Sequence, residues 1–317
     1  MDAISGLLAG PRAHSAFLLR SIMDPPWSIR IEDRAPLTVV AVVSGTAVIV
    51  PDEASDTGAA TTLGQGDVAI LRGPDSYTVA DRATTPPQVI IHPGQLCTAP
   101  DGSELTTMRE LGVRSWGNSP DGGTTLLTGT YQFEGEISRR LLSALPPLLV
   151  VPRGPTGSPL VPLLAEEIVR DDPGQEAVLD RLLDLVLIAG LRSWFSQPTA
   201  EAPAWFRGYS DPVVGTSLRL IHSDAAHPWT VDELARRSRV SRATFARRFT
   251  EVVGETPIAY LTEWRLALAA DLLHDPQETV ASVAGHVGYG SAFALSTAFK
   301  RARGVSPREH RARALHA

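Results

Sequence analysis

The order of apolar and polar residues divides the chain into a β-type first part and a helical second part. Short runs rich in Val and Ile predict strands where glycine, proline or aspartate bound them. These runs are Leu37–Val43, Thr46–Val50, Val68–Leu71 and Gln88–His92. Many short strands with glycine between them are typical of a sandwich or a small barrel. Residues 95–123, which hold two Asp-Gly pairs, predict a loop.

From Glu136 onward the apolar residues recur at helical spacing. The predicted helices span Ile137–Leu145, Leu160–Val169 and Gln175–Phe195. The last of these is apolar around much of its circumference, so either the core of the domain or a partner subunit must cover it. Core packing and a homodimer interface through residues 175–195 are therefore both open interpretations.

Residues 196–210, SQPTAEAPAWFRGYS, contain two prolines and many small residues, which is typical of a linker. We therefore predict a first domain over residues 1–195, a linker over 196–210 and a helical domain over 211–317. A chain of 317 residues agrees with two domains, because one domain usually contains about 100–200 residues. The expected fold class is α+β, with a β-barrel and accessory helices followed by an all-α domain.

The helical domain contains an internal repeat. One copy, TVDELARRSRVSRATFARRFTEVVGETPIAY, begins at Thr230, and the other, TVASVAGHVGYGSAFALSTAFKRARGVSPREH, begins at Thr279. The second copy holds one extra residue. The aligned positions are Ala235 with Ala284, Ser241 with Ser291, Phe245 with Leu295, Phe249 with Phe299, Gly254 with Gly304, and Pro257 with Pro307.

Each aligned position has a physical role in a pair of short helices. The alanines leave room for a second helix to cross close above the first. The serines are good N-caps, because their hydroxyl oxygen accepts hydrogen bonds from free backbone N–H groups. The larger apolar residues are buried at i, i+4, the glycines end helices and the prolines can open the next ones. Each copy is thus predicted to be a helix-turn-helix, and a long helix over Pro257–Leu273 connects them.

The repeat resembles the AraC/XylS family of transcription regulators. The resemblance is carried by Thr230–Phe249 with GETPIAYL behind it, and by VGYGSAFALSTAFKRARGVSPREHR over Val287–Arg311. Two helix-turn-helix motifs on one connector can reach major-groove segments about 34 Å apart, one turn of the duplex. Double-stranded DNA is therefore the expected partner and RNA polymerase a further candidate. The alternative is a helical bundle with a coincidental similarity.

The charges are distributed as expected for a basic module joined to an acidic one. The net charge of −6 argues against a nucleic-acid binder when it is taken alone. Residues 205–317, however, carry 15 Arg and Lys against 11 Asp and Glu, whereas residues 1–204 carry 14 against 24. A basic tail is also typical of a solvated surface, so the charge supports the DNA-binding interpretation without establishing it.

Outward residues near the start of each second helix are the expected contacts with base edges. These candidates are Arg242, Ala243, Thr244, Ala246 and Arg247 in the first motif, and Ala292, Phe293, Ser296 and Thr297 in the second. Similarity to the family places Ala243, Ala246 and Arg247 at base-reading positions. Arg247 is the strongest candidate, because a guanidinium can donate two hydrogen bonds to guanine. A plain surface role is the alternative for each arginine.

The second motif departs from the family pattern, because Thr297 stands where many relatives carry arginine. We expect its helix to contact thymine methyl groups through apolar side chains, or mainly to position the protein. Phosphate contacts orient a protein without specifying sequence. The candidates for phosphate contact are Ser241, Arg248, Ser291, Lys300 and Arg301.

The first part resembles the cupin-type sensor domain of one branch of the same family. The matching stretches are VVSGTAVIV, LGQGDVAILRGPDSYTVAD and TGTYQFEGEISRRLLSALPPLLVV. This resemblance implies a small β-barrel followed by helices. Cupin enzymes bind metal through histidines that residues 37–41 and the positions after Gly73-Pro74 lack. A cupin-fold metal-dependent enzyme is therefore the disfavoured alternative, and we expect neither catalysis nor a cofactor or metal.

His92 and Cys97, in IHPGQLC, are the chemically reactive pair of the first domain. They predict either a thiol redox sensor, with His92 lowering the pKa of Cys97, or a metal-sensing pair. The alternative is a buried structural cysteine beside a hydrogen-bonding histidine. Asp75, Tyr77 and Trp27 are candidates for lining an effector cavity.

The remaining compositional features indicate a cytoplasmic protein. Cys97 is the single cysteine, so an internal disulfide framework is excluded, as expected in a reducing compartment. The chain shows neither a signal peptide at its start nor an apolar run of the roughly 18–20 residues that a membrane span needs.

Overall fold

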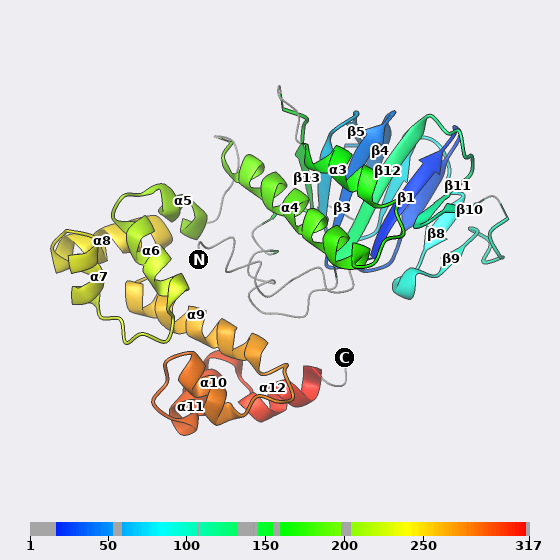
Figure 1. Ribbon diagram of the computed structural model, residues 1–317. Coiled ribbons are helices and arrows are strands. Elements are labelled where there is room, and N and C mark those ends of the chain that lie inside the picture. The colour runs from blue at the N-terminus through cyan, green and yellow to red at the C-terminus, as the bar shows by residue number, and fades with distance from the viewer. Residues whose placement is uncertain are drawn as a thin grey trace. The chain divides into compact units, whose positions relative to one another are not determined.

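The computed structural model describes residues 17–52, 59–106, 108–131, 142, 145–154, 159–197 and 204–314. These residues belong to two compact units, which are described separately: a β-rich unit, and a helical unit that contains residues 204–314 and Leu142 (Figure 1). This arrangement agrees with the expected α+β fold class. The helix predicted at Ile137–Leu145 lies outside the described residues, apart from Leu142 and Leu145.

The strands of the β-rich unit form two sheets. The first contains, in spatial order, β10 (Arg109–Gly112), β11 (Ser115–Gly117), β1 (Phe17–Met23), β12 (Thr124–Tyr131), β3 (Leu37–Ser44), β6 (Val68–Arg72) and β13 (Leu148–Val151). The second contains β5 (Thr61–Leu63), β4 (Ala47–Pro51), β7 (Tyr77–Ala80), β2 (Ser28–Ile31), β8 (Val89–Ile91) and β9 (Cys97–Thr98). Among the described strands no hydrogen bonding joins the two sheets into a closed barrel.

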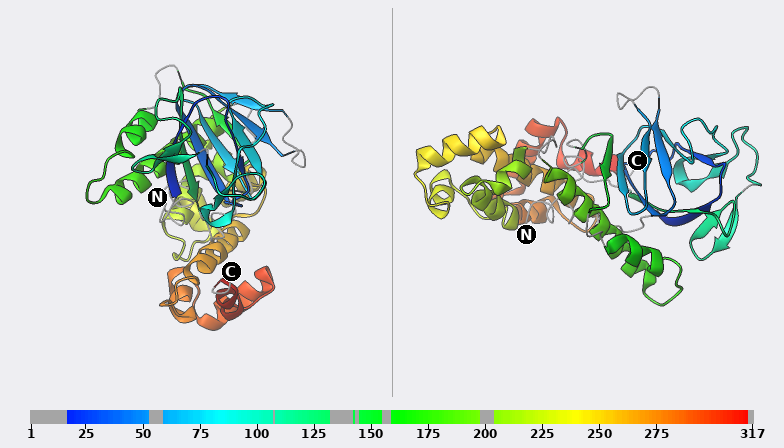
Figure 2. Two further views of the ribbon diagram at one scale, coloured as in Figure 1. Left: turned by 90° about the vertical axis from the view of Figure 1, so that its right-hand side faces the viewer. Right: turned by 90° about the horizontal axis from the view of Figure 1, so that it is seen from above.

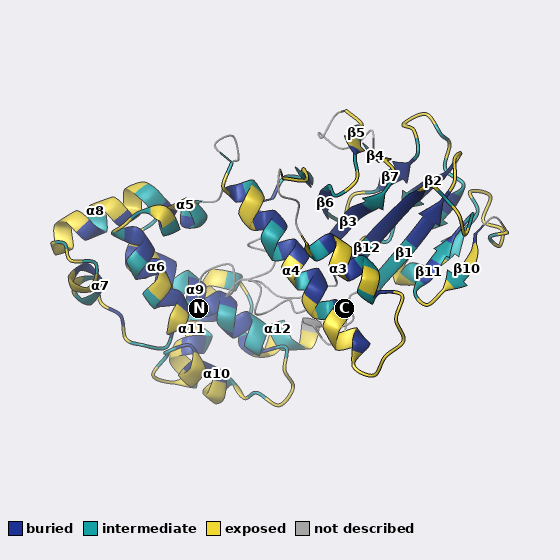
Figure 3. Cartoon of the chain, turned by 45° about the horizontal axis from the view of Figure 1, so that its top comes forward, coloured by how far each residue is buried: buried dark blue, intermediate teal, exposed yellow. Residues whose placement is uncertain are grey.

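An apolar core fills the space between the sheets. Val40 and Leu126 from the first sheet and Ile29 and Val79 from the second belong to one buried cluster. Figure 3 shows the buried residues concentrated in these strands. Successive side chains of a strand point to opposite faces, so each of these strands contributes alternate residues to the cluster.

Two helices, α3 (Leu160–Glu167) and α4 (Gln175–Phe195), cover the outer side of the first sheet (Figures 1 and 2). A Cβ atom at Gly129 of β12 would lie 2.6 Å from the methyl carbons of Leu183 of α4, so glycine permits this close approach. The predicted helix Gln175–Phe195 therefore has the expected bounds, and its inner side is part of the domain core. Val178 and Leu185 on its outer side are 44% and 47% exposed.

The prediction that residues 95–123 form a loop was wrong for three short segments, because β9, β10 and β11 lie within this range. Strand β11 pairs in parallel with β1, and the indole nitrogen of Trp116 donates a hydrogen bond of 2.7 Å to Ser21 Oγ. Strands of two to four residues are too short for a periodic pattern, and pairing stabilises them: β9 with β8, β10 with β11, and β11 with the distant strand β1.

The helical unit consists of eight helices in its described residues. They are α5 (Ala204–Ser210), α6 (Val214–Ser223), α7 (Val231–Arg237), α8 (Arg242–Val253), α9 (Pro257–Leu272), α10 (Val280–His286), α11 (Ala292–Arg303) and α12 (Pro307–Ala314). Helix α9 connects the α7–α8 pair to the α10–α11 pair (Figure 1). No helix in the described ranges has the length and apolar character needed to cross a bilayer.

Helix α5 occupies residues 204–210, where we expected the second half of a linker. Trp205 is 6% exposed, and Gly208 lies so close to α6 that a Cβ atom there would be 2.9 Å from a methyl carbon of Leu218. Packing of a tryptophan and a glycine against α6 and α8 thus stabilises a helix that the local composition does not indicate.

Candidate nucleic-acid interface

The first helix-turn-helix is formed by α7 and α8, and its capping residues are those predicted from the repeat. The Ser241 hydroxyl accepts a hydrogen bond of 3.2 Å from the backbone N–H of Thr244. Gly254 ends α8 in the left-handed conformation with φ of 89°, and Pro257 opens α9. Phe245 and Phe249 are fully buried, so the opposite side of α8 faces solvent.

The second helix-turn-helix, α10 and α11, repeats the same local structure. Ser291 accepts from the N–H of Ala294 at 3.2 Å, and Gly304 ends α11 with φ of 73°. Leu295 and Phe299 are fully buried. The turn contains Gly288, where φ is 81° and a Cβ atom would lie 2.5 Å from the backbone oxygen of Ala226, so only glycine fits without a shift.

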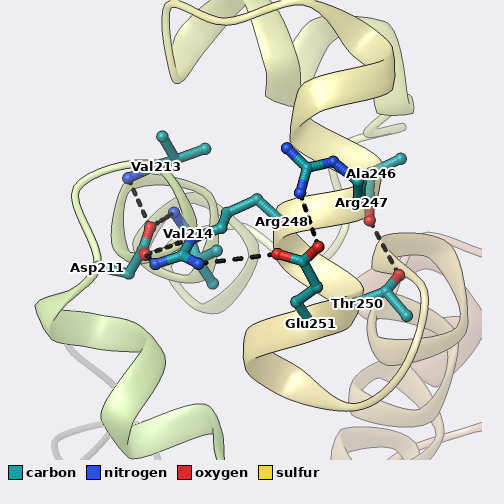
Figure 4. A network of polar contacts seen from close by, with 8 residues as sticks. All are labelled: Asp211, Val213, Val214, Ala246, Arg247, Arg248, Thr250 and Glu251. Atoms are coloured by element: carbon teal, nitrogen blue, oxygen red, sulfur yellow. Dashed lines mark hydrogen bonds and ion pairs between the residues drawn. The ribbon is translucent and has the colours of Figure 1, made fainter.

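Two arginines on the exposed side of α8 form ion pairs that lie in solvent. Arg242 lies 3.1 Å from Asp232, and Arg247 lies 2.7 Å from Glu251, one turn further along α8 (Figure 4). The side chains of Arg242 and Arg247 are 67% and 68% exposed. Exposed ion pairs of this kind contribute about 0–1 kcal/mol. Both guanidinium groups can therefore exchange their carboxylates for DNA groups at little cost.

Arg248 is held more firmly than its neighbours. Its Nε and Nη2 lie 2.9 Å and 2.8 Å from Asp211 Oδ2, and the Asp211 side chain is 9% exposed (Figure 4). Asp211 Oδ1 accepts hydrogen bonds from the N–H groups of Val213 and Val214, each of 2.9 Å. Burial acts to raise the pKa of Asp211, but the hydrogen bonds from Val214, Val213 and Arg248 together outweigh it and lower the pKa.

The remaining candidates on α8 are small residues. Ser241, Ala243 and Thr244 are exposed, and Ala246 is half-buried. Small side chains at the start of α8 leave its backbone open to close approach by another molecule.

Helix α11 presents a different surface from α8. Phe293, in its first turn, is 80% exposed, whereas its counterpart in α8 is Ala243. Ala292 and Ser296 are half-buried, and Ser291 and Thr297 are exposed. The cationic residues Lys300 and Arg301 are exposed in the last turns of the helix. Helix α8 therefore offers guanidinium groups near its start, and α11 offers an aromatic ring.

The structure does not bring the His92 ring to the Cys97 thiol. His92 Nε2 lies 2.9 Å from Thr98 Oγ1, and Cys97 Sγ lies 3.6 Å from the backbone oxygen of Gln95. Burial raises the pKa of Cys97, which disfavours the thiolate that a redox sensor requires. This geometry favours the structural interpretation of the pair.

A cavity of about 40 Å³ lies between the two sheets. Tyr77 lines it, as expected for one candidate, whereas Asp75 lines a separate shallow pocket and Trp27 is fully buried in the core. Thr130 was not among the sequence candidates, yet its Oγ1 is buried without a hydrogen-bond partner among the described residues. TTLLTGTY shows no regular alternation of polar and apolar residues, so no local signal marks Thr130 as an inward residue.

No group of three or more His, Cys, Asp or Glu side chains within the described part of the chain is arranged to hold a metal ion. The helical unit, with two capped helix-turn-helix motifs on one connecting helix, defines a double helix-turn-helix protein of the DNA-binding class.

Comparison with known proteins identifies the family. Residues 2–196 match the model described as cupin, and residues 234–313 match that described as helix-turn-helix domain. A putative AraC-like transcription regulator of Streptomyces lividans is 30% identical over 315 residues, which cover 98% of each chain. The HTH-type transcriptional regulator AlkR of Acinetobacter baylyi is 27% identical over 317 residues, covering 98% of this chain and 99% of its own.

A solved structure of the DNA-binding domain of AdpA, a global transcriptional factor, in complex with a target DNA shares 35% sequence identity. It covers 33% of this chain and 93% of its own, with a TM-score of 0.31. The chain belongs to the AraC-like transcription regulators, and it combines an N-terminal cupin domain with the DNA-binding domain of that family.

Proposed function

We propose that this regulator binds specific DNA sequences with α8 and α11 in successive major-groove segments, and that its cupin domain binds a small effector. The observation that carries the proposal is the pair of exposed, serine-capped helices on the single connector α9. Two such helices can read adjacent turns of one duplex.

Arg247 is proposed to read guanine, because its guanidinium is 68% exposed and its ion pair with Glu251 breaks at little cost. Arg242, Ala243, Thr244 and Ala246 are proposed to line the same contact. On α11 the proposed base contacts are Ala292, Phe293, Ser296 and Thr297. Ser241, Ser291, Lys300 and Arg301 are proposed to contact phosphates, which orient both helices.

The test is competition between operator and random DNA. Sites mapped across the genome supply the operator, and affinity is measured for the wild type and for Arg247→Ala. Arg219→Ala on α6 is the matched control, because Arg219 is an exposed arginine outside both recognition helices. We expect Arg247→Ala to lose discrimination of about 1–3 kcal/mol while the control loses none. Equal binding of operator and random DNA by the wild type would refute sequence-specific recognition.

The cavity between the sheets is the proposed effector site. Among its described lining residues Asp33 alone is charged, so an anionic effector is disfavoured. Thr130 Oγ1 can donate to or accept from a polar group of a small, mainly apolar molecule. Thermal unfolding with short alcohols and with carboxylates of equal size tests this. Thr130→Val, which keeps the shape of the side chain, should abolish the shift produced by the alcohols.

A second copy of the chain is the proposed partner for the outer side of α4. Val178 and Leu185, seven residues apart, are both exposed there. Sedimentation should show that Leu185→Glu dissociates a dimer. Leu163→Glu on α3, where Leu163 is also 47% exposed, is the control.

A further inference from the structure

Arg248 belongs to a chain of charged groups that runs from the start of α6 to the exposed side of α8. Asp211 Oδ2 binds its Nε and Nη2, and Glu251 Oε2 lies 3.7 Å from its Nη1 (Figure 4). The other carboxylate oxygen of Glu251 lies 2.7 Å from Arg247. The guanidinium proposed to read bases is thus connected to Asp211 through Glu251 and Arg248.

Asp211 is itself fixed by the backbone around it. Its carboxylate caps the first turn of α6 through Val213 and Val214, and it follows directly after α5. Helix α5 packs against α8: a Cβ atom at Gly208 would lie 3.5 Å from Val252 Cγ1. Val252 is one turn beyond Arg248, so the same side of α8 makes both contacts.

We propose that Asp211 and Arg248 are positioning residues that hold α8 against the α5–α6 junction and orient Arg247 toward the bases, and that Arg248 does not bind phosphate. This inference rests on the proposed function and replaces the phosphate role expected for Arg248. We call the Arg248–Asp211 pair the clamp.

A phosphate contact through Nε or Nη2 of Arg248, the two nitrogens that face Asp211, would require the clamp to open. Opening would leave the Asp211 carboxylate, 9% exposed, without its cation, and an uncompensated charge in such a place is costly. The ion pairs of Arg242 and Arg247 lie in solvent and carry no comparable cost. In the free protein Arg242 and Arg247 are therefore available to DNA, whereas Arg248 is already bound to Asp211.

Arg248→Lys separates the two roles in the full-length protein. Lysine keeps the positive charge and binds phosphate well, but it lacks the two-donor fork that fits Asp211. We expect Arg248→Lys to lower affinity for the operator about tenfold and to leave affinity for random DNA unchanged. Asp211→Asn should produce the same loss, and the double variant should lose no more than either single variant.

Lys300→Met and Arg248→Met provide the matched measurement of salt dependence. The logarithm of the binding constant falls linearly with the logarithm of the salt concentration. Removing a phosphate contact makes this slope less steep by about one. We expect that decrease for Lys300→Met and an unchanged slope for Arg248→Met. An Arg248→Lys variant that binds the operator like the wild type, or an Asp211→Asn variant that binds more tightly, would overturn the clamp.

These outcomes are distinct from failure of the proposed function. If the wild type does not prefer its operator, sequence-specific binding itself is refuted. If the wild type does prefer its operator, the results for Arg248→Lys and Asp211→Asn test the clamp alone. Circular dichroism and thermal unfolding of each variant identify losses caused by unfolding, which would reduce binding to operator and random DNA together.

Discussion

The hydroxyl of Tyr209 lies 2.6 Å from Nδ1 of His222, and Nε2 of the same ring lies 2.7 Å from the hydroxyl of Tyr260. A neutral imidazole donates with one nitrogen and accepts with the other, so one tyrosine accepts and the other donates. His222 is 8% exposed and also packs 4.2 Å, between ring centroids, from Trp264. The ring therefore joins α5, α6 and α9 within the first half of the DNA-binding domain.

His222→Leu should destabilise this domain, because it keeps a side chain of similar size but removes both hydrogen bonds to the tyrosines. We expect the free energy of unfolding to fall by about 2–3 kcal/mol, the cost of losing hydrogen bonds from buried polar groups. Chemical denaturation of the full chain, followed by tryptophan fluorescence, measures this change. Tyr209→Phe, which removes one bond, should cost less, and an unchanged stability of His222→Leu would show that the ring has no structural role.

Phe293 should read thymine through its methyl group. The 80% exposed ring stands at the start of α11, where apolar contact with the C5-methyl of thymine is available in the major groove. Replacing each thymine of the second half-site by uracil removes one methyl group. At the contacted position we expect about fourfold weaker binding, from ~0.8 kcal/mol for a buried group of this size.

The variant Phe293→Ala completes a double-mutant cycle for this contact. It should bind the thymine and the uracil operators equally, because the partner of the methyl group is absent. If the uracil substitutions weaken the wild type and Phe293→Ala by the same factor, the ring does not contact a methyl group.

The double helix-turn-helix could be predicted from the sequence, because its signals are local. Ser241 and Ser291 cap their helices through a backbone N–H three residues away, and Gly254 and Gly304 end them. The Arg248–Asp211 pair could not be predicted, because 37 residues separate its members and nothing in either neighbourhood indicates the other. The contact forms only because α5 and α6 pack against α8.

The first domain was predicted less completely for a related reason. The strands found from sequence, such as β3 and β6, are continuous runs of apolar residues, most of them β-branched, that are buried on both faces. Strand β12 combines threonine and glycine with leucine, and its identity depends on packing between α4 and the second sheet. The Thr130 hydroxyl in the cavity could not be placed before that packing was known.

Cys97 should react slowly with alkylating reagents in the folded protein. Burial raises the pKa of its thiol, so a smaller fraction is thiolate at neutral pH than in a free cysteine. The rate of modification by iodoacetamide should therefore be lower in the native protein than in the same protein in denaturant. A faster reaction in the native protein would restore the redox-sensor interpretation of His92 and Cys97.

Asp211 should make the free energy of unfolding of the DNA-binding domain depend on pH in the acidic range. Its pKa is lowered in the folded protein, so its contribution is fully present above the unfolded pKa of about 3.9. The contribution is lost as the pH falls below that value through the lowered pKa, because the protonated carboxyl releases Arg248. Asp211→Asn should be less stable than the wild type at pH 6, and the difference should shrink at pH 3. A constant difference across this range would contradict the role of ionised Asp211.

Gly117 should tolerate no side chain, because the backbone of β1 lies too close to it. A Cβ atom at this position would lie 1.8 Å from the backbone oxygen of Ile22, with which its strand pairs. Backbone atoms in a paired strand cannot rotate away, so Gly117→Ala should force β11 from the sheet. We expect a loss of about 2 kcal/mol or more in the stability of the first domain, measured by thermal unfolding.

Gly123→Ala is the control for this substitution, because a Cβ atom at Gly123 would have no other atom within 4 Å. DNA binding by the helical domain should survive Gly117→Ala, since both recognition helices lie outside the β-rich unit. A loss of stability without a loss of DNA binding would therefore locate the damage in the first domain. A Gly117→Ala protein as stable as Gly123→Ala would show instead that β11 is not held at this spacing.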